Sequence, residues 1–131
     1  MAGGAPFDLR RTFVDIAGDG ATAIDVTETF WADLASGARR IDGFLMGRFA
    51  MSESPAHWEI HPKGDEIFHL VSGAIEVVLE EQAGERRVTL APGESFIVPR
   101  GTWHRIEVRE PGEMLFITYG EGTDHKPVEP V

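Results

Sequence analysis

Cysteine is absent from this chain of 131 residues, and no apolar run approaches the roughly 20 residues that are needed to span a bilayer. The missing cysteine excludes disulfide bonds, thiolate metal ligands and a cysteine nucleophile. The missing apolar span predicts that the protein has no membrane partner. Residues 1–11 also lack a basic region followed by an apolar stretch, so we expect no secretory signal and a cytoplasmic location.

Basic residues are scarce, because the chain has 12 Lys and Arg against 22 Asp and Glu, for a net charge of −10. Non-specific binding to a nucleic acid depends on clustered Lys and Arg that contact the phosphates. The adjacent basic pairs of the sequence lie at 10–11, 39–40 and 86–87, and none is interleaved with aromatic residues. We therefore expect no nucleic-acid partner.

Many short apolar stretches alternate with turn residues along the chain. Turn signals such as Ser-Gly at 72–73 and Pro-Gly at 92–93 and 111–112 recur at intervals of roughly 8–12 residues, which is typical of an all-β sandwich or barrel. A short helix is expected around 30–35, with Gly37 as its stop. The expected strands are 23–26, 42–51, 57–61, 66–71, 75–81, 86–90, 95–98, 103–109 and 113–119.

The length predicts a single domain over residues 1–131, with its core at about 9–120. The two ends, 1–8 and 121–131, are rich in Gly, Pro and acidic residues, and we expect both to be loosely held. Trp58 and Trp103 alternate away from the polar residues described below. Two outward tryptophans and an exposed sheet edge predict a homodimer.

Two segments place imidazole and carboxylate groups inside apolar, β-rich surroundings. Residues 59–66 read Glu-Ile-His-Pro-Lys-Gly-Asp-Glu, and residues 99–104 read Pro-Arg-Gly-Thr-Trp-His. His104 shares a strand face with Ile106, so it is predicted to point inward. Glu66 leads directly into the apolar stretch 67–71, where an unpaired carboxylate would be costly.

These polar residues also have ordinary structural explanations. His57, Glu59 and His61 share one strand face, which fits the solvated side of a half-buried sheet. A single inward His104 fits a core histidine that is satisfied by a backbone carbonyl. A buried carboxylate beside buried imidazoles, however, needs a cation or hydrogen-bond donors. Two histidines with one or two carboxylates make a nitrogen and oxygen site that suits a divalent metal.

The spacing between seven particular residues resembles the two sequence motifs of the cupin superfamily. The resemblance is to its small single-domain members. Four and six residues separate the members of the first motif, and five, one and two residues separate those of the second. Together the motifs cover roughly 57–107. The matching residues are His61, Glu66 and Gly73 for the first motif, and Gly93, Pro99, Gly101 and His104 for the second.

The resemblance implies a double-stranded β-helix, or jelly roll, with a metal held inside the barrel near one mouth. It assigns three of the four usual ligands to His61, Glu66 and His104. The family commonly has a histidine where this chain has Glu59. Glu59 is therefore expected to act as the fourth ligand, or to stand beside the metal as a catalytic base. His57 is an alternative fourth ligand, although it lies two residues further along the strand.

The donor set suits Fe, Mn, Ni or Zn as a divalent ion, and the residues do not select one of them. Resemblance to cupins permits an enzyme, such as a dioxygenase, isomerase, decarboxylase or lyase, that acts on a small organic molecule. It equally permits a non-catalytic module that binds or senses a sugar or an organic acid, because a fold alone does not choose a function. Both readings predict a small-molecule partner.

Overall fold

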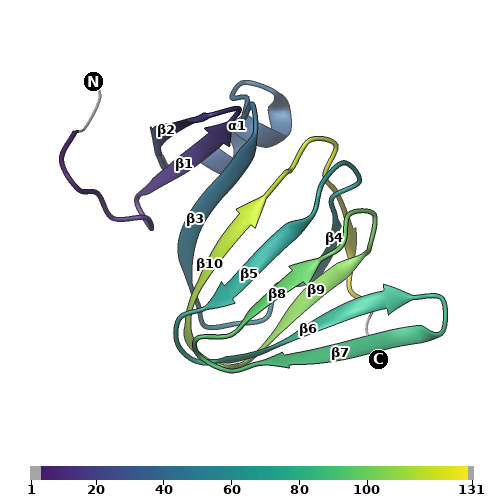
Figure 1. Cartoon of the computed structure of the whole chain (residues 1–131). Coiled ribbons are helices and arrows are strands. Elements are labelled where there is room, and N and C mark those ends of the chain that lie inside the picture. The colour runs from purple at the N-terminus through teal and green to yellow at the C-terminus, as the bar shows by residue number, and fades with distance from the viewer. Residues whose placement is uncertain (1–3, 130–131) are drawn as a thin grey trace.

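The computed structural model describes residues 4–129, which form two antiparallel sheets that face each other (Figure 1). The first sheet has the order β2-β1-β3-β10-β5-β8 and the second the order β11-β4-β9-β6-β7. The elements are β1 (Thr12–Ala17), β2 (Gly20–Asp25), α1 (Phe30–Ser36), β3 (Phe44–Met51), β4 (His57–Ile60), β5 (Glu66–Leu70), β6 (Ala74–Glu81), β7 (Gly84–Leu90), β8 (Ser95–Val98), β9 (His104–Glu110), β10 (Gly112–Thr118) and β11 (Asp124–Pro127).

The expected β-rich architecture is confirmed, and the strands expected between 42 and 119 all form with ends within two residues of those predicted. The predicted helix is present as α1, and it ends at Gly37, which has the left-handed φ of 83° that favours glycine. The strand expected at 23–26 begins earlier, as β2. Because hydrophobic alternation and turn residues act locally, this part of the fold is readable from the sequence.

Two strands escaped the sequence prediction. The first, β1, pairs with β2 and β3, and its Asp15 accepts hydrogen bonds from the backbone N–H groups of Asp42 (2.9 Å) and Gly43 (3.0 Å). The second, β11, lies within the C-terminal stretch that we expected to be loosely held. That expectation is wrong for 124–127, since these residues pair with β4. The parts of that expectation that concern 1–3 and 130–131 fall outside the described residues.

The interior between the sheets is filled by apolar side chains from both of them. An aromatic group links α1 to this core, because the ring of Phe13 stands edge-on to those of Phe30 (5.3 Å) and Phe116 (5.4 Å). Burying such rings is the dominant stabilising contribution to a core of this kind. The largest fully buried side chains are Phe30, Leu70, Ile75, Leu79, Leu90, Met114, Val77, Val78 and Val98.

The glycine that closes the first motif permits a close approach of two turns. Gly73 has a φ of +87°, and a Cβ there would lie 2.7 Å from the carbonyl oxygens of both Glu110 and Pro111. The turn that follows β5 therefore packs directly against the turn between β9 and β10. No residue with a Cβ can adopt this left-handed φ without strain and also allow this close contact.

Candidate metal centre

Three of the predicted site residues converge at one end of the barrel. The Nε2 atoms of His61 and His104 lie 3.2 Å and 2.8 Å from the same Glu66 oxygen, Oε1. The two imidazole rings are 5.1 Å apart, centre to centre. Residues from the two sequence motifs, such as Glu66 and His104, which are 38 residues apart along the chain, thus share one cluster of polar atoms.

Backbone hydrogen bonds hold the two motif turns together. The N–H of Gly101 donates to the carbonyl oxygen of His61 (2.9 Å), and the N–H of Arg100 donates to the Asp65 carboxylate (2.8 Å). In Figure 1 the turn between β4 and β5 lies at the same end of the barrel as the turn between β8 and β9. Each motif therefore forms its own strand–turn–strand unit, and these hydrogen bonds connect the two turns.

The alternation of side chains orients the cluster inward. His61, Glu66 and His104 are 4%, 5% and 3% exposed, as the inward prediction for His104 requires. The sequence left the direction of Glu66 open, because both faces of its strand are apolar. The structure puts it on the face of Phe68 and Leu70, both buried. An ionisable group in such a place needs compensating partners.

The compensation is visible in the acid–base properties of the cluster. Burial by itself raises the pKa of Glu66, but hydrogen bonds from His104 and His61, together with electrostatic attraction to both rings, outweigh it and lower this pKa to about 2. Burial lowers the pKa of His104, but the hydrogen bond to Glu66, the negative charge of Glu66 and the hydrogen bond to the Thr102 carbonyl together more than reverse this, so the pKa of that imidazole is raised. Negative charge therefore concentrates on Glu66 at neutral pH.

Other hydrogen bonds orient the imidazoles. The Nδ1–H of His104 donates to the carbonyl oxygen of Thr102 (3.0 Å), and Nδ1 of His61 is hydrogen-bonded to the Thr123 hydroxyl (2.8 Å). The Thr118 hydroxyl donates to the second oxygen of Glu66. With Nδ1 engaged in this way, the Nε2 atom of each ring is the one that faces the centre, which is how metal-binding histidines are commonly oriented.

The sequence did not point to these three threonines. Thr118 is the cross-strand partner of Glu66 in the β10–β5 pairing, and Thr123 lies in the loop before β11. Thr118 has a weak signal, since it ends an apolar strand where a hydroxyl is unexpected. Thr102 contributes only its backbone carbonyl, so its side chain carries no signal at all.

Glu59 lies at the rim of the cluster rather than inside it. Its side chain is 36% exposed, its Oε2 is 3.4 Å from Nε2 of His61, and it is the register partner of His104 on β9. Glu59, His61 and His104 each offer a ligand atom within 4.8 Å of the others. His57, the alternative fourth ligand, instead contacts Glu59 from the outer side, with Nε2 3.4 Å from Oε1.

The donor set fits a divalent ion. Ligand atoms bound at roughly 2.0–2.2 Å from a common ion lie about 3–3.5 Å from one another. The contacts of His61 with Glu59 and Glu66 are already in this range, at 3.4 Å and 3.2 Å. The 2.8 Å contact between His104 and Glu66 is a hydrogen bond and has to open by a few tenths of an ångström. Imidazole and carboxylate without sulfur suit Fe, Mn, Ni or Zn.

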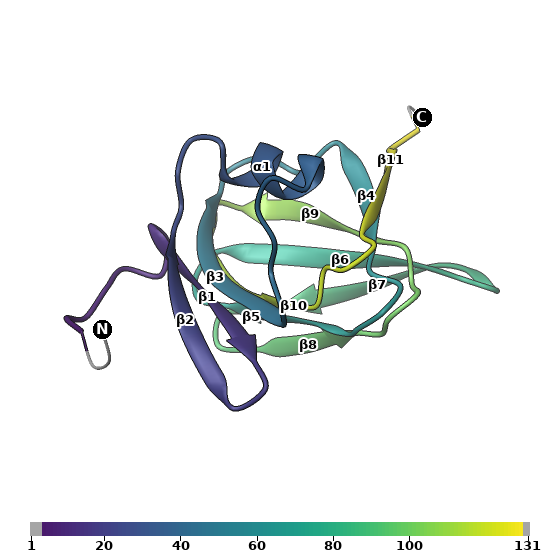
Figure 2. The same cartoon turned by 90° about the horizontal axis from the view of Figure 1, so that it is seen from above.

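The cluster opens into a cavity of about 1650 Å³. Its lining combines aromatic side chains, such as Phe49, Phe68 and Phe116, with polar groups from the rim. Figure 2 looks down on this end of the molecule, with α1 and the β11 segment at its edge. Apolar side chains combined with convergent polar groups are the usual lining of a small-molecule site.

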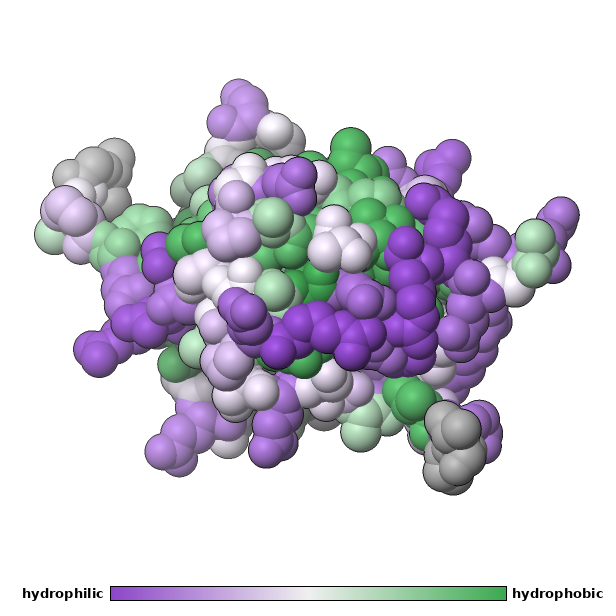
Figure 3. Space-filling model, turned by 90° about the horizontal axis from the view of Figure 1, so that it is seen from below, coloured by the Kyte–Doolittle hydropathy of each residue, from purple (hydrophilic) through white to green (hydrophobic). Residues whose placement is uncertain are grey.

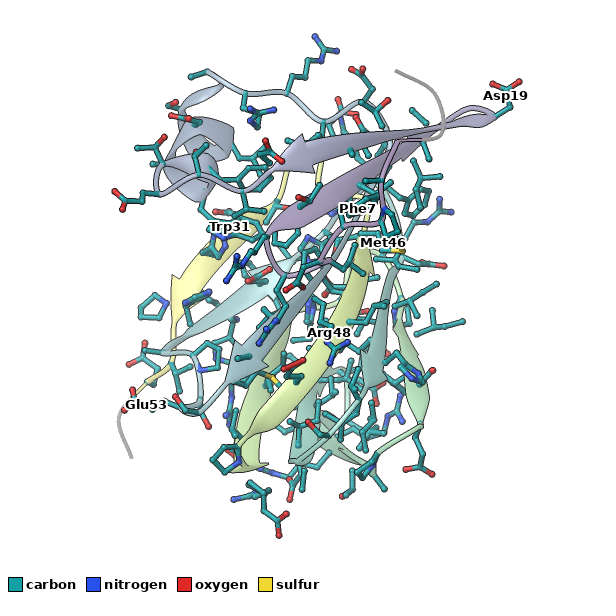
Figure 4. The ribbon with its side chains drawn as sticks, turned by 90° about the vertical axis from the view of Figure 1, so that its left-hand side faces the viewer. Phe7, Asp19, Trp31, Met46, Arg48 and Glu53 are labelled. Atoms are coloured by element: carbon teal, nitrogen blue, oxygen red, sulfur yellow. The ribbon has the colours of Figure 1, made fainter. Side chains whose placement is uncertain are left out.

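Arg48 of β3 also lines this cavity. Its Nε donates to Glu113 of β10 (2.5 Å), and Arg10 contacts the same carboxylate. Figure 4 shows Arg48 beside these strands, below Trp31 of α1. Because the charge of Arg48 is already paired with that of Glu113, this side chain joins β3 to β10 rather than offering an unpaired charge to a ligand.

The stretch of the chain from β3 to β10 matches a known protein family. The family model for the cupin domain matches residues 48–119, which is more than half of the chain and contains His61, Glu66 and His104. No curated protein matches the sequence. Among residues 4–129, no helix has the length and apolar character that crossing a membrane demands.

Solved structures share the fold at low sequence identity. A cupin-2 domain protein from Shewanella frigidimarina superposes with a TM-score of 0.51 at 19% identity, over 61% of this chain and 74% of that one. A protein from Neisseria meningitidis gives a TM-score of 0.50 at 22% identity, over 60% and 76%. Oxalate oxidase in complex with glycolate gives 0.52 at 20% identity, over 66% of this chain and only 46% of its own.

These similarities concern the barrel fold, and they do not show that the proteins share a chemistry. The motif spacing, the two facing sheets and the family match agree with one another. The chain belongs to the cupin domain family.

Proposed function

We propose that the protein binds a divalent metal ion through His61, Glu66 and His104, with Glu59 as the fourth ligand or as a base beside the ion, and acts on a small organic molecule in the adjoining cavity. The observation that carries this proposal is the meeting of both imidazole Nε2 atoms on one buried carboxylate oxygen, at 3.2 Å and 2.8 Å. A divalent ion there supplies a Lewis acid or a redox centre.

The residues of the chain have distinct parts in such a site. His61 and His104 present Nε2 because their Nδ1 atoms are held by Thr123 and by the Thr102 carbonyl. Glu66 brings the negative charge that balances a cation inside an apolar shell. Glu59 reaches both the cluster and the cavity, so it is the carboxylate best placed to take a proton from a bound molecule. The aromatic lining excludes water from the apolar part of that molecule.

Metal analysis tests the proposal directly. Protein freed of metal with a chelator is titrated with Mn²⁺ in a calorimeter, and protein purified without chelator is analysed for metals. We expect H104A and E66A to weaken Mn²⁺ binding at least tenfold, because each variant removes an inner ligand. H69A is the matched control, since His69 of β5 contacts Ser95 of β8, away from the cluster. Unchanged Mn²⁺ binding in both H104A and E66A contradicts the proposal.

A second candidate function, a non-catalytic module that binds a sugar or an organic acid, is favoured by a different observation. Glu66 already receives hydrogen bonds from two imidazoles and the Thr118 hydroxyl, so the cluster is satisfied without an ion. The two functions differ at Glu59. In an enzyme, E59Q removes turnover while ligand binding persists, whereas a binding module has no turnover to lose.

A further inference from the structure

Two of the five histidines of the chain form a second group outside the inner cluster. His57 and His125 both face Oε1 of Glu59, with Nε2 at 3.4 Å and 3.8 Å respectively. Their rings are 5.0 Å apart, centre to centre. The three residues each offer a ligand atom within 4.8 Å of the other two. Since Oε2 of Glu59 faces His61, this one carboxylate lies between an inner and an outer histidine pair.

The fold brings the outer group together from two strands. His57 and Glu59 are two residues apart on β4, so they share a face of that strand. His125 is the register partner of Glu59 in the antiparallel pairing of β11 with β4. Directly opposed residues of such a pair have Cβ atoms about 5 Å apart, so the three side chains meet above one short stretch of sheet.

A surface ion pair is the ordinary explanation for a histidine beside a glutamate, and exposed pairs of this kind contribute little. The distances argue for a different use. At 3.8 Å the contact of His125 with Glu59 is too long for a hydrogen bond, and the 3.4 Å contact of His57 is at its outer limit. Both are close to the separation of about 3.4 Å between two ligands of one tetrahedral ion.

We propose that His57, Oε1 of Glu59 and His125 form a second divalent-cation site, distinct from the inner cluster. Two imidazoles and one carboxylate are the ligands that Zn²⁺, Ni²⁺ and Co²⁺ accept, and three protein ligands leave a position open. The side chains of the site are 44%, 36% and 54% exposed, so an ion reaches it from solvent without any rearrangement of the barrel.

The site has a structural consequence and a chemical one. An ion bound there joins β11 to β4, and so fastens the C-terminal strand to the sheet. It also lies on the same cavity as the inner cluster, because all six of the side chains in the two groups line that cavity. Glu59 then bridges the two sites, because Oε1 faces the outer pair of histidines and Oε2 faces His61.

Zinc titration of chelator-treated protein tests the site. We expect the wild type to bind two equivalents of Zn²⁺ and both H57A and H125A to lose one, with at least a tenfold loss of affinity for that equivalent. H69A is the control and is expected to keep two. These substitutions lie at exposed or half-buried positions, so folding is expected to be kept. Two full equivalents in both H57A and H125A overturn the proposal.

A second readout separates the outer site from the inner one. Hydrogen–deuterium exchange of the β11 amides is measured with and without Zn²⁺, and we expect the ion to slow it in the wild type and in H104A. H57A is expected to lose this protection. If H104A keeps one equivalent and the protection, the outer site stands even where the inner metal site fails. If Zn²⁺ leaves β11 exchange unchanged in the wild type, no ion joins β11 to β4 and the proposal fails.

Discussion

Glu66 is ionised in surroundings that oppose ionisation, and its neighbours explain how. At 5% exposure the carboxyl is cut off from water, and hydrogen bonds from two imidazoles, together with electrostatic attraction to them, keep it ionised. The Thr118 hydroxyl donates a further hydrogen bond to it. The same contacts raise the pKa of His104. Carboxylate and imidazole are therefore coupled, and each favours the charged form of the other.

The coupling predicts how the stability of the metal-free protein depends on pH. Glu66 has a pKa of about 2 when folded against 4.5 ordinarily, so its contribution is present above pH 4.5 and is lost as the pH falls toward 2. His104 has a raised pKa, so its contribution is complete below pH 6.5 and is lost as the pH rises through the folded value. We expect the free energy of unfolding contributed by this pair to be largest between pH 4.5 and 6.5.

Urea unfolding of chelator-treated protein at a series of pH values measures this profile. The shift at Glu66 corresponds to a loss on the order of 3 kcal/mol across the acid limb. In E66Q both limbs are expected to shrink, whereas in E53Q, which changes an exposed carboxyl, the profile is expected to stay as in the wild type. A profile for E66Q that matches the wild type contradicts the coupling.

Among the structural elements, the turns determine how closely the two sheets and the two motifs approach. Gly73 and Gly93 are both motif glycines, and both have a left-handed φ, +87° and +88°. They differ in their surroundings. A Cβ on Gly73 meets the carbonyl oxygens of Glu110 and Pro111 at 2.7 Å, while a Cβ on Gly93 has nothing within 4 Å.

The pair of glycines separates backbone strain from steric contact. We expect G93A to lose about 1 kcal/mol of the free energy of unfolding through strain alone. G73A is expected to lose clearly more, because the turn after β5 must also move away from the turn between β9 and β10. Thermal unfolding of both variants gives the comparison. Equal losses of stability in the two variants would contradict this prediction, because they would show that relieving the close approach at Gly73 costs no free energy.

At the scale of the whole molecule, the structure removes one of the two arguments for a homodimer, the outward tryptophans. Trp58 is only 6% exposed, because Arg105 and Lys126 lie over its ring at 5.0 Å and 5.5 Å. Lys126 also covers the ring of Trp103. These tryptophans belong to an outer packing layer. In the space-filling view of Figure 3, hydrophobic residues show near the centre of one face, bordered by hydrophilic ones.

The edge strand is what remains of the argument for a homodimer. Strand β8 ends the first sheet in the described part of the chain, and its Ile97 is 57% exposed. We expect a dimer in solution and a monomer for I97K, since a charge on the edge blocks strand pairing. Size-exclusion chromatography with light scattering measures both, with V71K as the control at another exposed apolar residue. A monomeric wild type disproves the prediction.

The sequence by itself determined the strands between 42 and 119, the helix with its glycine stop, and the inward direction of His104. These follow from alternation and turn residues, which depend only on near neighbours in the chain. It also identified His61, Glu66 and His104 as a group, through the spacing of two motifs. Their role as metal ligands and the extent of the domain over 1–131 stay predictions.

Tertiary structure alone decided how these local pieces meet. The face of Glu66 was open because both sides of its strand are apolar, and only the packing of the two sheets chose one. The C-terminal strand was missed because 124–127 has a loop-like composition, and its pairing with β4 is what makes it a strand. The same register puts His125 of this strand opposite Glu59. Register between distant segments is set by backbone hydrogen bonds and packing, which no pattern within a single segment records.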